Sequence, residues 1–376
     1  MKKIFIFVQQ LSKPGGSETV EVLLANEFSK QYKTYLVVTG EPLNKEFFHV
    51  SKEVEIIYIN RPQNSQIDEK IVEFCKVKQK IKAFLLVFKN VHYALFGKFK
   101  IRKKIKELTT EEDVLIGSSL DNYLIIPRRR KFIMHYHFNE KKFNSFFESL
   151  TRCLFRKPNA YVFLNDEIKN SIIKKHKSIK KKSYAILNPI KVSRELILKE
   201  NSNNLVFIGR FSKQKNLSLM IDSLNLLKEQ NLNFRLDMYG DGPEKENIIK
   251  QVNDLDLNDF IFIHPSTNNV KEALENKDLL LLSSSFEGTP LVISEANALS
   301  VPVFSTNFGL TTQSVITLKN GRIASKNDKE TYAKELMELL SNKELMKSLR
   351  ISSFESTEKY DIGEIVKNWV EIFKKF

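Results

Sequence analysis

The sequence predicts an α/β protein made of two doubly wound domains, each a parallel sheet with helices on both faces. Three observations lead to this prediction. The 376 residues are enough for two domains of ordinary size. Short apolar runs alternate with helical patterns through both halves of the chain. A polar stretch at 188–204 separates the halves, so we expect an N-terminal domain over 1–190 and a C-terminal domain over 200–358.

The alternation is most regular in the second half. Apolar strands of this continuous kind are typical of a parallel sheet that is covered on both faces. Strands are expected at 205–209, 234–240, 260–265, 278–284 and 301–306, and helices at 216–230, from residue 243, at 269–277 and at 290–300. Residues 361–376 have the spacing of an amphipathic helix and include the only tryptophan, Trp369.

The first half repeats the pattern more loosely. Strands are expected at 2–8, 35–40, 55–60, 113–119, 131–137, 160–165 and 184–188, with an amphipathic helix at 18–30. The apolar run after Lys2 and Lys3 is too short for a signal peptide, and no later run could cross a bilayer. Cys75 and Cys153 form no metal or disulfide spacing. We therefore expect a soluble or peripheral protein of a reducing compartment.

The positive charge is concentrated in the first half. Residues 1–190 have 36 Lys and Arg against 19 Asp and Glu, whereas the whole chain has a formal net charge of +15. Residues 76–106 interleave 11 basic residues with apolar and aromatic ones and have no acid, and 128–131 and 172–183 add further basic runs. This pattern favours a surface that lies on anionic lipid headgroups. A solvated basic face is the alternative, and no motif indicates a nucleic-acid partner.

Candidate binding residues follow the predicted strands, because ligands of open α/β sheets bind beyond the carboxyl ends of strands. Arg210 and Lys215 follow the strand at 205–209, where two cations near a helix N-terminus suit a diphosphate. Gly15 and Gly16 follow the first strand and would let the backbone approach a ligand closely. Solvated loop cations and a plain strand–helix turn are the alternative interpretations.

Two glutamates, Glu287 and Glu295, have seven residues between them in a segment that otherwise has the composition of a core. Glu287 lies in the loop after the strand at 278–284. Glu295 lies on the next helix, for which we expect Thr289 as N-cap and Pro290 as the first helical residue. A carboxylate on an apolar helix needs a polar partner, and ribose hydroxyls would suit Glu295. The alternative is that Glu295 lies on the solvated flank of a surface helix.

His135 and His137 end the strand at 131–137, and their alternation places both on the same side. They could form part of a metal site, but the sequence nearby supplies no third ligand. We therefore expect one of them to contact a substrate and the other to pack. The chain has an Asp-x-Asp pattern, Asp254 to Asp256, in a polar helix-to-strand connection, which favours a solvated turn over a metal site.

Three of these segments together resemble the retaining glycosyltransferases of family four. They are LVFIGRFSKQKNLSLMIDSL (205–224), YGDGPE (239–244) and SSSFEGTPLVISEANALSVPVFST (283–306), in which Glu287 and Glu295 match the family's E-x7-E motif. The likeness spans nearly the whole chain and is looser before residue 205. It implies the GT-B fold, two Rossmann-like domains that face a central cleft, with the helix at 361–376 packing back on the N-terminal domain. NFGLTTQSV (307–315) departs from the family, since Gln313 stands about where an acidic residue is usual.

The resemblance also implies roles for single residues. Arg210 and Lys215 match the pair that holds the donor diphosphate. Glu295 matches the residue that holds the ribose, and Glu287 matches the one near the transferred sugar. Glu287 is expected to orient this sugar, while the leaving phosphate takes the proton of an acceptor that attacks from the same face.

The remaining matches lie on both domains. Backbone contacts to sugar and phosphate are implied for Gly288, Thr289, Pro290 and Leu291. Gly15 and Gly16 match the loop that closes over the donor from the N-terminal domain. His137 matches the histidine near the sugar better than His135 does, because Asn139 follows it at the expected distance.

The implied activity is that of a retaining hexosyltransferase that uses a nucleotide sugar, most often UDP-linked in this family, and no metal or other cofactor. Arg210, Lys215 and the helix N-terminus near Pro290 would stabilise the leaving diphosphate. A lipid-linked or cell-surface glycan acceptor would explain the basic first half, and places the enzyme in the cytoplasm at the inner face of a bacterial membrane. A non-catalytic GT-B partner subunit, a nucleotide-sugar epimerase and sucrose or trehalose metabolism remain open.

Overall fold

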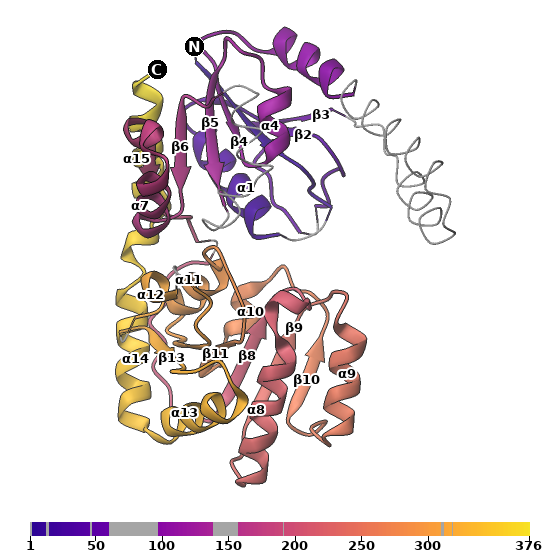
Figure 1. The fold of residues 1–376 in the computed structure, drawn as a ribbon, viewed down its shortest axis with the longest axis vertical. Coiled ribbons are helices and arrows are strands. Elements are labelled where there is room, and N and C mark those ends of the chain that lie inside the picture. The colour runs from indigo at the N-terminus through magenta and orange to yellow at the C-terminus, as the bar shows by residue number, and fades with distance from the viewer. Residues whose placement is uncertain are drawn as a thin grey trace, which may run out of the picture.

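The computed structural model describes residues 2–12, 15–45, 47–59, 97–137, 157–190, 192–309, 312–317 and 319–376. They form two parallel sheets, one in each half of the chain. Figure 1 shows the two halves as separate bodies stacked along the long axis, with helices around each sheet. The prediction of two doubly wound α/β domains is confirmed. Within the described ranges, no helix combines the length and the apolar character that crossing a membrane requires.

The N-terminal sheet has seven strands in the order β3-β2-β1-β4-β5-β6-β7, and all its neighbours pair in parallel. Its strands are apolar because both faces are covered: Ile4 and Ile6 enter one core cluster, while Phe5 and Phe7 enter the other. The strands are β1 (Lys3–Val8), β2 (Lys33–Val38), β3 (Val54–Tyr58), β4 (Val114–Gly117), β5 (Lys131–Tyr136), β6 (Ala160–Phe163) and β7 (Ser183–Ala185).

The helices of this domain include the last one of the chain, α15 (Ile362–Lys374). Its apolar residues share one face and pack into the same core as α1 (Gly16–Phe28), and they are Ile365, Val366, Trp369, Ile372 and Phe373. Asp361 caps α15 by accepting from the Glu364 N–H at 3.1 Å. The other helices are α4 (Leu120–Ile125), α7 (Asp166–Lys175) and the 3-10 helix η1 (Lys177–Lys182), and residues 97–108 are also helical.

The C-terminal sheet has six parallel strands in the order β10-β9-β8-β11-β12-β13. They are β8 (Asn204–Ile208), β9 (Arg235–Tyr239), β10 (Ile261–His264), β11 (Leu279–Leu282), β12 (Val303–Ser305) and β13 (Gly321–Ile323). The helices are η2 (Lys213–Lys215), α8 (Leu217–Glu229), α9 (Lys245–Asp254), α10 (Val270–Leu274), α11 (Leu291–Ala298), α12 (Thr312–Val315), α13 (Lys329–Ser341), α14 (Lys343–Glu355) and η3 (Glu358–Tyr360).

Both sheets reverse their strand order beside their first strand. In the N-terminal sheet the reversal lies between β1 and β4, and in the C-terminal sheet between β8 and β11. Such a reversal leaves a crevice at the carboxyl ends of the two strands, because the loops that follow them leave in opposite directions. The loops after β1, β8 and β11 hold most of the candidate residues named above. The strand order therefore places these residues at the crevices of the two sheets.

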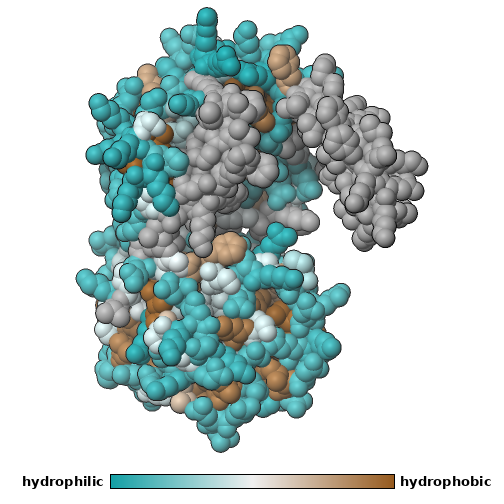
Figure 2. Space-filling view, in the orientation of Figure 1, coloured by the Kyte–Doolittle hydropathy of each residue, from teal (hydrophilic) through white to brown (hydrophobic). Residues whose placement is uncertain are grey.

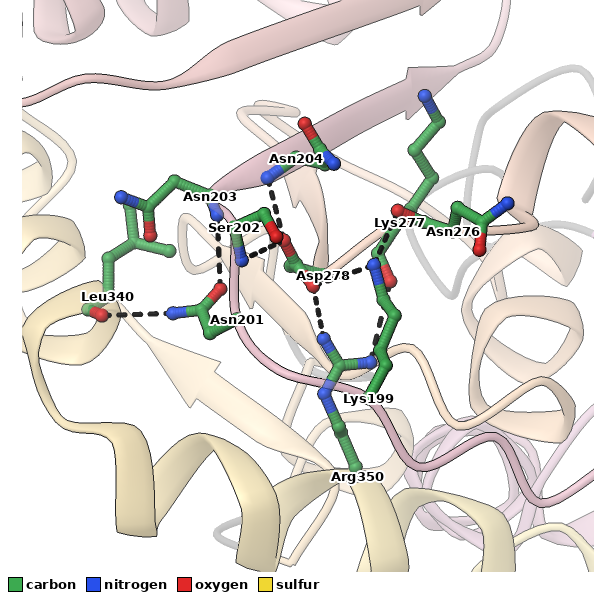
Figure 3. Close-up of polar contacts among 10 residues, drawn as sticks. All are labelled: Lys199, Asn201, Ser202, Asn203, Asn204, Asn276, Lys277, Asp278, Leu340 and Arg350. Atoms are coloured by element: carbon green, nitrogen blue, oxygen red, sulfur yellow. Dashed lines mark hydrogen bonds and ion pairs between the residues drawn. The ribbon is translucent and has the colours of Figure 1, made fainter.

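A buried aspartate, Asp278, closes the opposite edge of the C-terminal sheet just before β11 (Figure 3). Its carboxylate accepts the backbone N–H groups of Ser202 at 2.9 Å and Asn204 at 2.7 Å. It also pairs with the Arg350 guanidinium of α14 and with the Lys199 ammonium, which lies 2.9 Å away. The segment between the two sheets is also fastened to the C-terminal domain before this point, because Arg194 Nε donates to Thr357 Oγ1 at 2.9 Å and the Glu195 N–H donates to the Ala298 carbonyl at 2.7 Å.

Candidate active site

An ion pair joins the two loops at the crevice of the C-terminal sheet. The Lys215 ammonium, from the loop after β8, lies 2.6 Å from Glu287 Oε1, from the loop after β11. Ser284 Oγ donates to the same oxygen at 2.8 Å, and Gln214 Nε2 donates to the other oxygen at 3.3 Å. Three neighbours thus fix the Glu287 carboxylate, and its side chain stays 11% exposed.

Further hydrogen bonds hold the same two loops together. Ser283 Oγ donates to the Lys215 carbonyl at 2.8 Å, and the Ser285 N–H donates to the Gln214 carbonyl at 2.9 Å. The Lys215 side chain folds over Gly209, where a Cβ would lie 3.7 Å from its Nζ. The next residue, Arg210, is exposed. Two cations of one short loop therefore lie at the strand end, as a diphosphate site requires.

Gly240 and Gly242, in the segment YGDGPE, allow the loop after β9 to pack closely against the loop after β8. A Cβ on Gly240 would lie 2.1 Å from the Gly209 carbonyl, and one on Gly242 would lie 2.3 Å from the Phe211 carbonyl. Gly242 also has a φ of +151°, which L side chains rarely adopt. The loop after β9 can approach the loop after β8 only because both positions are glycine.

Glu295 lies on α11, where residues 292–298 are all buried, and it is itself 5% exposed. The interpretation of Glu295 as a solvated flank is therefore wrong. The predicted helix start is also wrong by one residue: Pro290 takes the N-cap position with an extended ψ of 117°, and α11 begins at Leu291. Thr289 consequently caps nothing, and its Oγ1 is buried without a hydrogen-bond partner in the described part of the chain.

The two domains touch beside these residues. A Cβ on Gly288 would lie 2.8 Å from the His137 carbonyl at the end of β5. A Cβ on Gly16, at the start of α1, would lie 3.7 Å from Leu291 Cδ1, and Leu291 packs against the core that contains α1. The loop after β11 and the start of α11 thus meet β5 and α1 of the other domain.

A buried cluster of Glu21, His135 and His137 lies at this contact. Glu21 Oε1, from α1, is 3.1 Å from His135 Nδ1 and 3.0 Å from His137 Nε2. The side chains of Glu21 and His135 are each 1% exposed, and that of His137 is 6% exposed. The ring edge of Trp369, from α15, packs on His135 with centroids 5.0 Å apart.

Glu21 corrects the expectation that the two histidines lack a third ligand. Each of the three residues offers one ligand atom, and these atoms lie within 4.8 Å of one another. The sequence contains a signal for this: Glu21 shares a helix face with Ala25 and Phe28, an unusual place for an acid. Asn139, which favoured His137 over His135 as the substrate contact, lies outside the described residues.

The cluster shifts the pKa values of Glu21 and His135. Burial alone would raise the pKa of Glu21, but the charges and hydrogen bonds of His135 and His137 lower it to about 2. Burial, together with repulsion from His137, lowers the pKa of His135 to about 4. At neutral pH, Glu21 is therefore a carboxylate and His135 is a neutral ring.

Two other expectations have mixed outcomes. Asp254 ends α9 and Asp256 forms an exposed left-handed turn with a φ of +52°, as expected of a solvated connection. In the basic run 128–131, however, Arg130 is buried and donates to Thr109 Oγ1 at 2.8 Å and to the Lys106 carbonyl at 3.1 Å, so it holds a helix end. Cys75, Cys153 and residues 76–96 of the longest basic run lie outside the described residues.

Residues 190–355, which include the C-terminal sheet, match the family described as glycosyl transferases group 1. A glycosyltransferase of Haemophilus influenzae whose function is uncharacterised is 25% identical over 376 residues, covering 98% of this chain and 99% of that protein. The C-terminal half of the chain is a group 1 glycosyltransferase domain. A second relative of this glycosyltransferase is the poly(ribitol-phosphate) alpha-N-acetylglucosaminyltransferase of Staphylococcus aureus, which is 19% identical over 99% of this chain and 86% of its own.

A solved structure resembles the glycosyltransferase over its full length. It is the Staphylococcus aureus TarM G117R mutant in complex with fondaparinux, alpha-GlcNAc-glycerol and UDP. Its TM-score is 0.78 at 14% identity, covering 99% of this chain and 100% of that one. The shared arrangement of two parallel-sheet domains confirms the GT-B fold.

Proposed function

We propose that this glycosyltransferase transfers a hexose from a nucleotide sugar, with UDP as the nucleotide, to a lipid-linked or cell-surface glycan, with retention of configuration and without a metal. The observation that carries the proposal is the Lys215–Glu287 ion pair of 2.6 Å, which joins the loops at the crevice of the C-terminal sheet. The relatives add support, because the TarM structure holds UDP and the other Staphylococcus aureus relative is named for the transfer of N-acetylglucosamine to poly(ribitol-phosphate).

The cations of the crevice would stabilise the leaving group. Cleavage of the bond between the sugar and the diphosphate leaves negative charge on the phosphate oxygens. Lys215 has three donors and uses one on Glu287, so it can also bind a phosphate oxygen, and Arg210 lies in the same loop. Fixed positive groups of this kind lower the barrier most where the charge develops.

The two glutamates would hold the two ends of the donor. Glu295 lies in the buried stretch of α11, where a carboxylate can accept hydrogen bonds from both ribose hydroxyls. Glu287 is held by Lys215, Ser284 and Gln214, and would accept from the hydroxyls of the transferred sugar. Thr289 Oγ1, buried without a partner among the described residues, would supply a further polar contact.

Retention would follow from attack on the face that the diphosphate leaves. The bond from the sugar to the phosphate oxygen breaks, the bond to the acceptor oxygen forms, and the acceptor proton passes to the leaving phosphate. Glu287 then orients the sugar and forms no bond to it. We expect Glu287→Gln to keep measurable turnover. Complete loss of activity in Glu287→Gln, together with a covalent sugar adduct on Glu287 of the wild type detected by mass spectrometry, would contradict this mechanism and favour a carboxylate nucleophile.

The first experiment is calorimetric titration of the metal-free protein with UDP, GDP and a panel of UDP-sugars. We expect UDP to bind, and Glu295→Ala to lose most of that affinity. Glu338→Ala, an exposed glutamate on α13, is the matched control and should bind as the wild type does. If no nucleotide binds to the wild type, the catalytic proposal falls and the partner-subunit alternative leads.

The acceptor side of the proposal includes a membrane surface. On the helix of residues 97–108, Phe99 is 74% exposed and stands between Lys98 and Lys100. An exposed aromatic ring flanked by cations is typical of a helix that lies on anionic headgroups. Figure 2 shows hydrophilic side chains over most of the remaining described surface in that view. The glycosyltransferase would then act at the inner face of the cell membrane.

Co-sedimentation with phosphatidylglycerol and phosphatidylcholine vesicles tests this surface. We expect binding to the anionic vesicles alone, weakened at least tenfold in a Phe99→Ser, Lys100→Glu, Lys103→Glu variant. The control, Lys250→Glu with Lys347→Glu, changes the charge by the same amount at two exposed positions of the C-terminal domain, on α9 and α14. Equal losses in both variants would indicate general electrostatic attraction, and no vesicle binding by the wild type would favour the epimerase or a soluble acceptor.

A further inference from the structure

Only one of the two oxygens of the Glu21 carboxylate accepts hydrogen bonds from the described residues. Its Oε1 accepts from both His135 and His137, whereas its Oε2 is buried without a hydrogen-bond partner. No Lys or Arg among the described residues forms an ion pair with it. Buried polar atoms nearly always have a hydrogen-bond partner, so a buried carboxylate oxygen without one indicates a role beyond stability.

The contacts of Glu21 decide which nitrogen of each histidine carries a proton. A carboxylate only accepts, so His137 must donate from Nε2 and His135 from Nδ1. For His137, this leaves Nδ1 as the nitrogen that makes no hydrogen bond to the described residues. The neutral ring therefore presents a lone pair at Nδ1, and the protonated ring would present an N–H at the same place.

His137 also lies against the loop that holds Glu287. A Cβ on Gly288 would lie 2.8 Å from the His137 carbonyl, and Gly288 directly follows Glu287. The His135 ring packs on His137 with centroids 4.0 Å apart and on the Trp369 edge at 5.0 Å. Glu21 and His135 thus contact the ring of His137 directly, and Trp369 supports it through His135. All of these residues belong to the N-terminal domain.

We propose that Glu21 is a positioning residue of the transferase site, which holds the His137 ring through Nε2–H so that Nδ1 faces the bound donor. The presence of a donor in this inference rests on the proposed function, whereas the orientation of the His137 ring rests on its contact with Glu21. Two histidines and one carboxylate can also bind a transition metal. In this structure, however, both rings lie within hydrogen-bond distance of Glu21 Oε1, an arrangement that forms without a metal. Metal binding is therefore an outcome of the test.

The ring state can be measured without any activity. In the wild-type protein labelled with nitrogen-15 histidine, NMR should show His137 protonated at Nε2 throughout the neutral range, with assignment from His137→Gln. Elemental analysis of the same sample should find no stoichiometric metal. An unprotonated Nε2 on His137, or one equivalent of bound metal, would overturn the proposal. This arm holds even if the variants of Glu21 fail to fold.

Kinetics test the consequence for transfer. Glu21→Gln should lower kcat by 10- to 100-fold, the range found for residues that orient a reactive neighbour, while UDP affinity stays within twofold. The pH profile of kcat should shift, and Glu21→Asp should restore part of the rate. Glu27→Gln, on the same helix and paired with Lys30 at 2.7 Å, should behave as the wild type does.

The kinetic outcomes separate the two proposals. An unchanged kcat and pH profile in Glu21→Gln would overturn the positioning role, while UDP binding and transfer by the wild type would still support the proposed function. If the wild type binds no nucleotide, the proposed function falls, and so does the presentation of Nδ1 to a donor. The NMR result would then describe a buried histidine pair alone.

Discussion

Asp278 and Glu21 are both buried acids. Asp278 lies where β11 begins, whereas Glu21 lies on α1 beside the end of β5, and the two differ in how many hydrogen bonds and ion pairs their oxygens accept. Asp278 accepts two backbone N–H groups and pairs with Arg350 and Lys199 (Figure 3). Glu21 has two histidines on one oxygen and nothing on the other. Asp278 lies at the amino ends of strands, away from the domain contact, whereas Glu21 lies beside it.

The difference separates an acid that stabilises the fold from one that serves the site. Four donors around Asp278 compensate for its loss of water, and they connect the interdomain segment, β11 and α14. Glu21 lacks such compensation but controls the orientation of a histidine at the domain contact. If this distinction holds, substitutions at the two sites should change different quantities.

The largest expected effect is on stability, from Asp278→Asn. The change leaves the Arg350 guanidinium, which is 2% exposed, buried without an anion, and this typically destabilises a protein by about 3–5 kcal/mol. Urea denaturation measures the loss. Asp254→Asn, an exposed acid of the same domain, should stay within about 0.5 kcal/mol of the wild type. Equal stability of the two variants would break the comparison.

The pH dependence of stability comes second and concerns the Glu21 cluster. His135 has a pKa of about 4 when folded and about 6.5 when unfolded, so the unfolded chain binds the extra proton. Stability should therefore fall as the pH drops from 6.5 to about 4, by roughly 1–3 kcal/mol. The stabilisation from the ionised Glu21 is lost in a lower window that overlaps this one, as the pH falls from 4.5 to about 2.

The contribution of His135 can be isolated by urea denaturation at pH 7 and pH 4.5. His135→Gln should lose less stability between the two pH values than the wild type does, since it has no group to protonate. The same comparison for His49→Gln, outside the cluster, should match the wild type. A wild-type-like pH response in His135→Gln would show that folding does not shift the pKa of His135, which would contradict the expected lowering.

A smaller effect on stability is expected from Glu21→Gln. The amide oxygen can still accept from one histidine, and the change removes a buried charge that has no counter-ion among the described residues. The free energy of unfolding at pH 7 should therefore change by less than about 1.5 kcal/mol. Thermal and urea denaturation check this. A loss as large as that of Asp278→Asn would make Glu21 a structural acid.

The smallest effect is expected from Lys199→Met at the Asp278 cluster. The Lys199 side chain is 20% exposed, and Asp278 keeps Arg350 and both backbone donors without it. Partly exposed ion pairs of this kind contribute about 0.2–1 kcal/mol. Urea denaturation of Lys199→Met and Asp278→Asn in parallel would show how much of the stabilisation by Asp278 depends on Lys199. A decrease of more than about 2 kcal/mol in the free energy of unfolding of Lys199→Met would mean that Lys199 is the main partner of Asp278.

The sequence predicted the sheets well because their signal is local. Most predicted strands of the second half contain a continuous apolar run, and residues 205–209 correspond to β8 within one position. β13 escaped prediction because it has three residues, only one of them fully buried. The start of α11 was misplaced because the usual preference of proline for the first helical turn gave way to an extended Pro290.

The site could be predicted only in part, for a related reason. Strand ends and spacing singled out Lys215 and Glu287, and the fold joins them across 72 residues of sequence. Glu21 and His137 are 116 residues apart and lie on a helix and a strand whose packing no local pattern describes. A glutamate on the buried face of a predicted helix was the available signal.

The place of Trp369 has a consequence for how the chain matures during synthesis. The ribosome makes residues 3–185 first, yet the core around α1 needs the apolar face of α15, made almost 180 residues later. The C-terminal sheet contains all its strands before α15 emerges, so it can reach its final form first. The histidine side of the active site is therefore expected to be the last part to become rigid, and ribosome-bound chains arrested before residue 362 should bind nucleotide before they can transfer sugar.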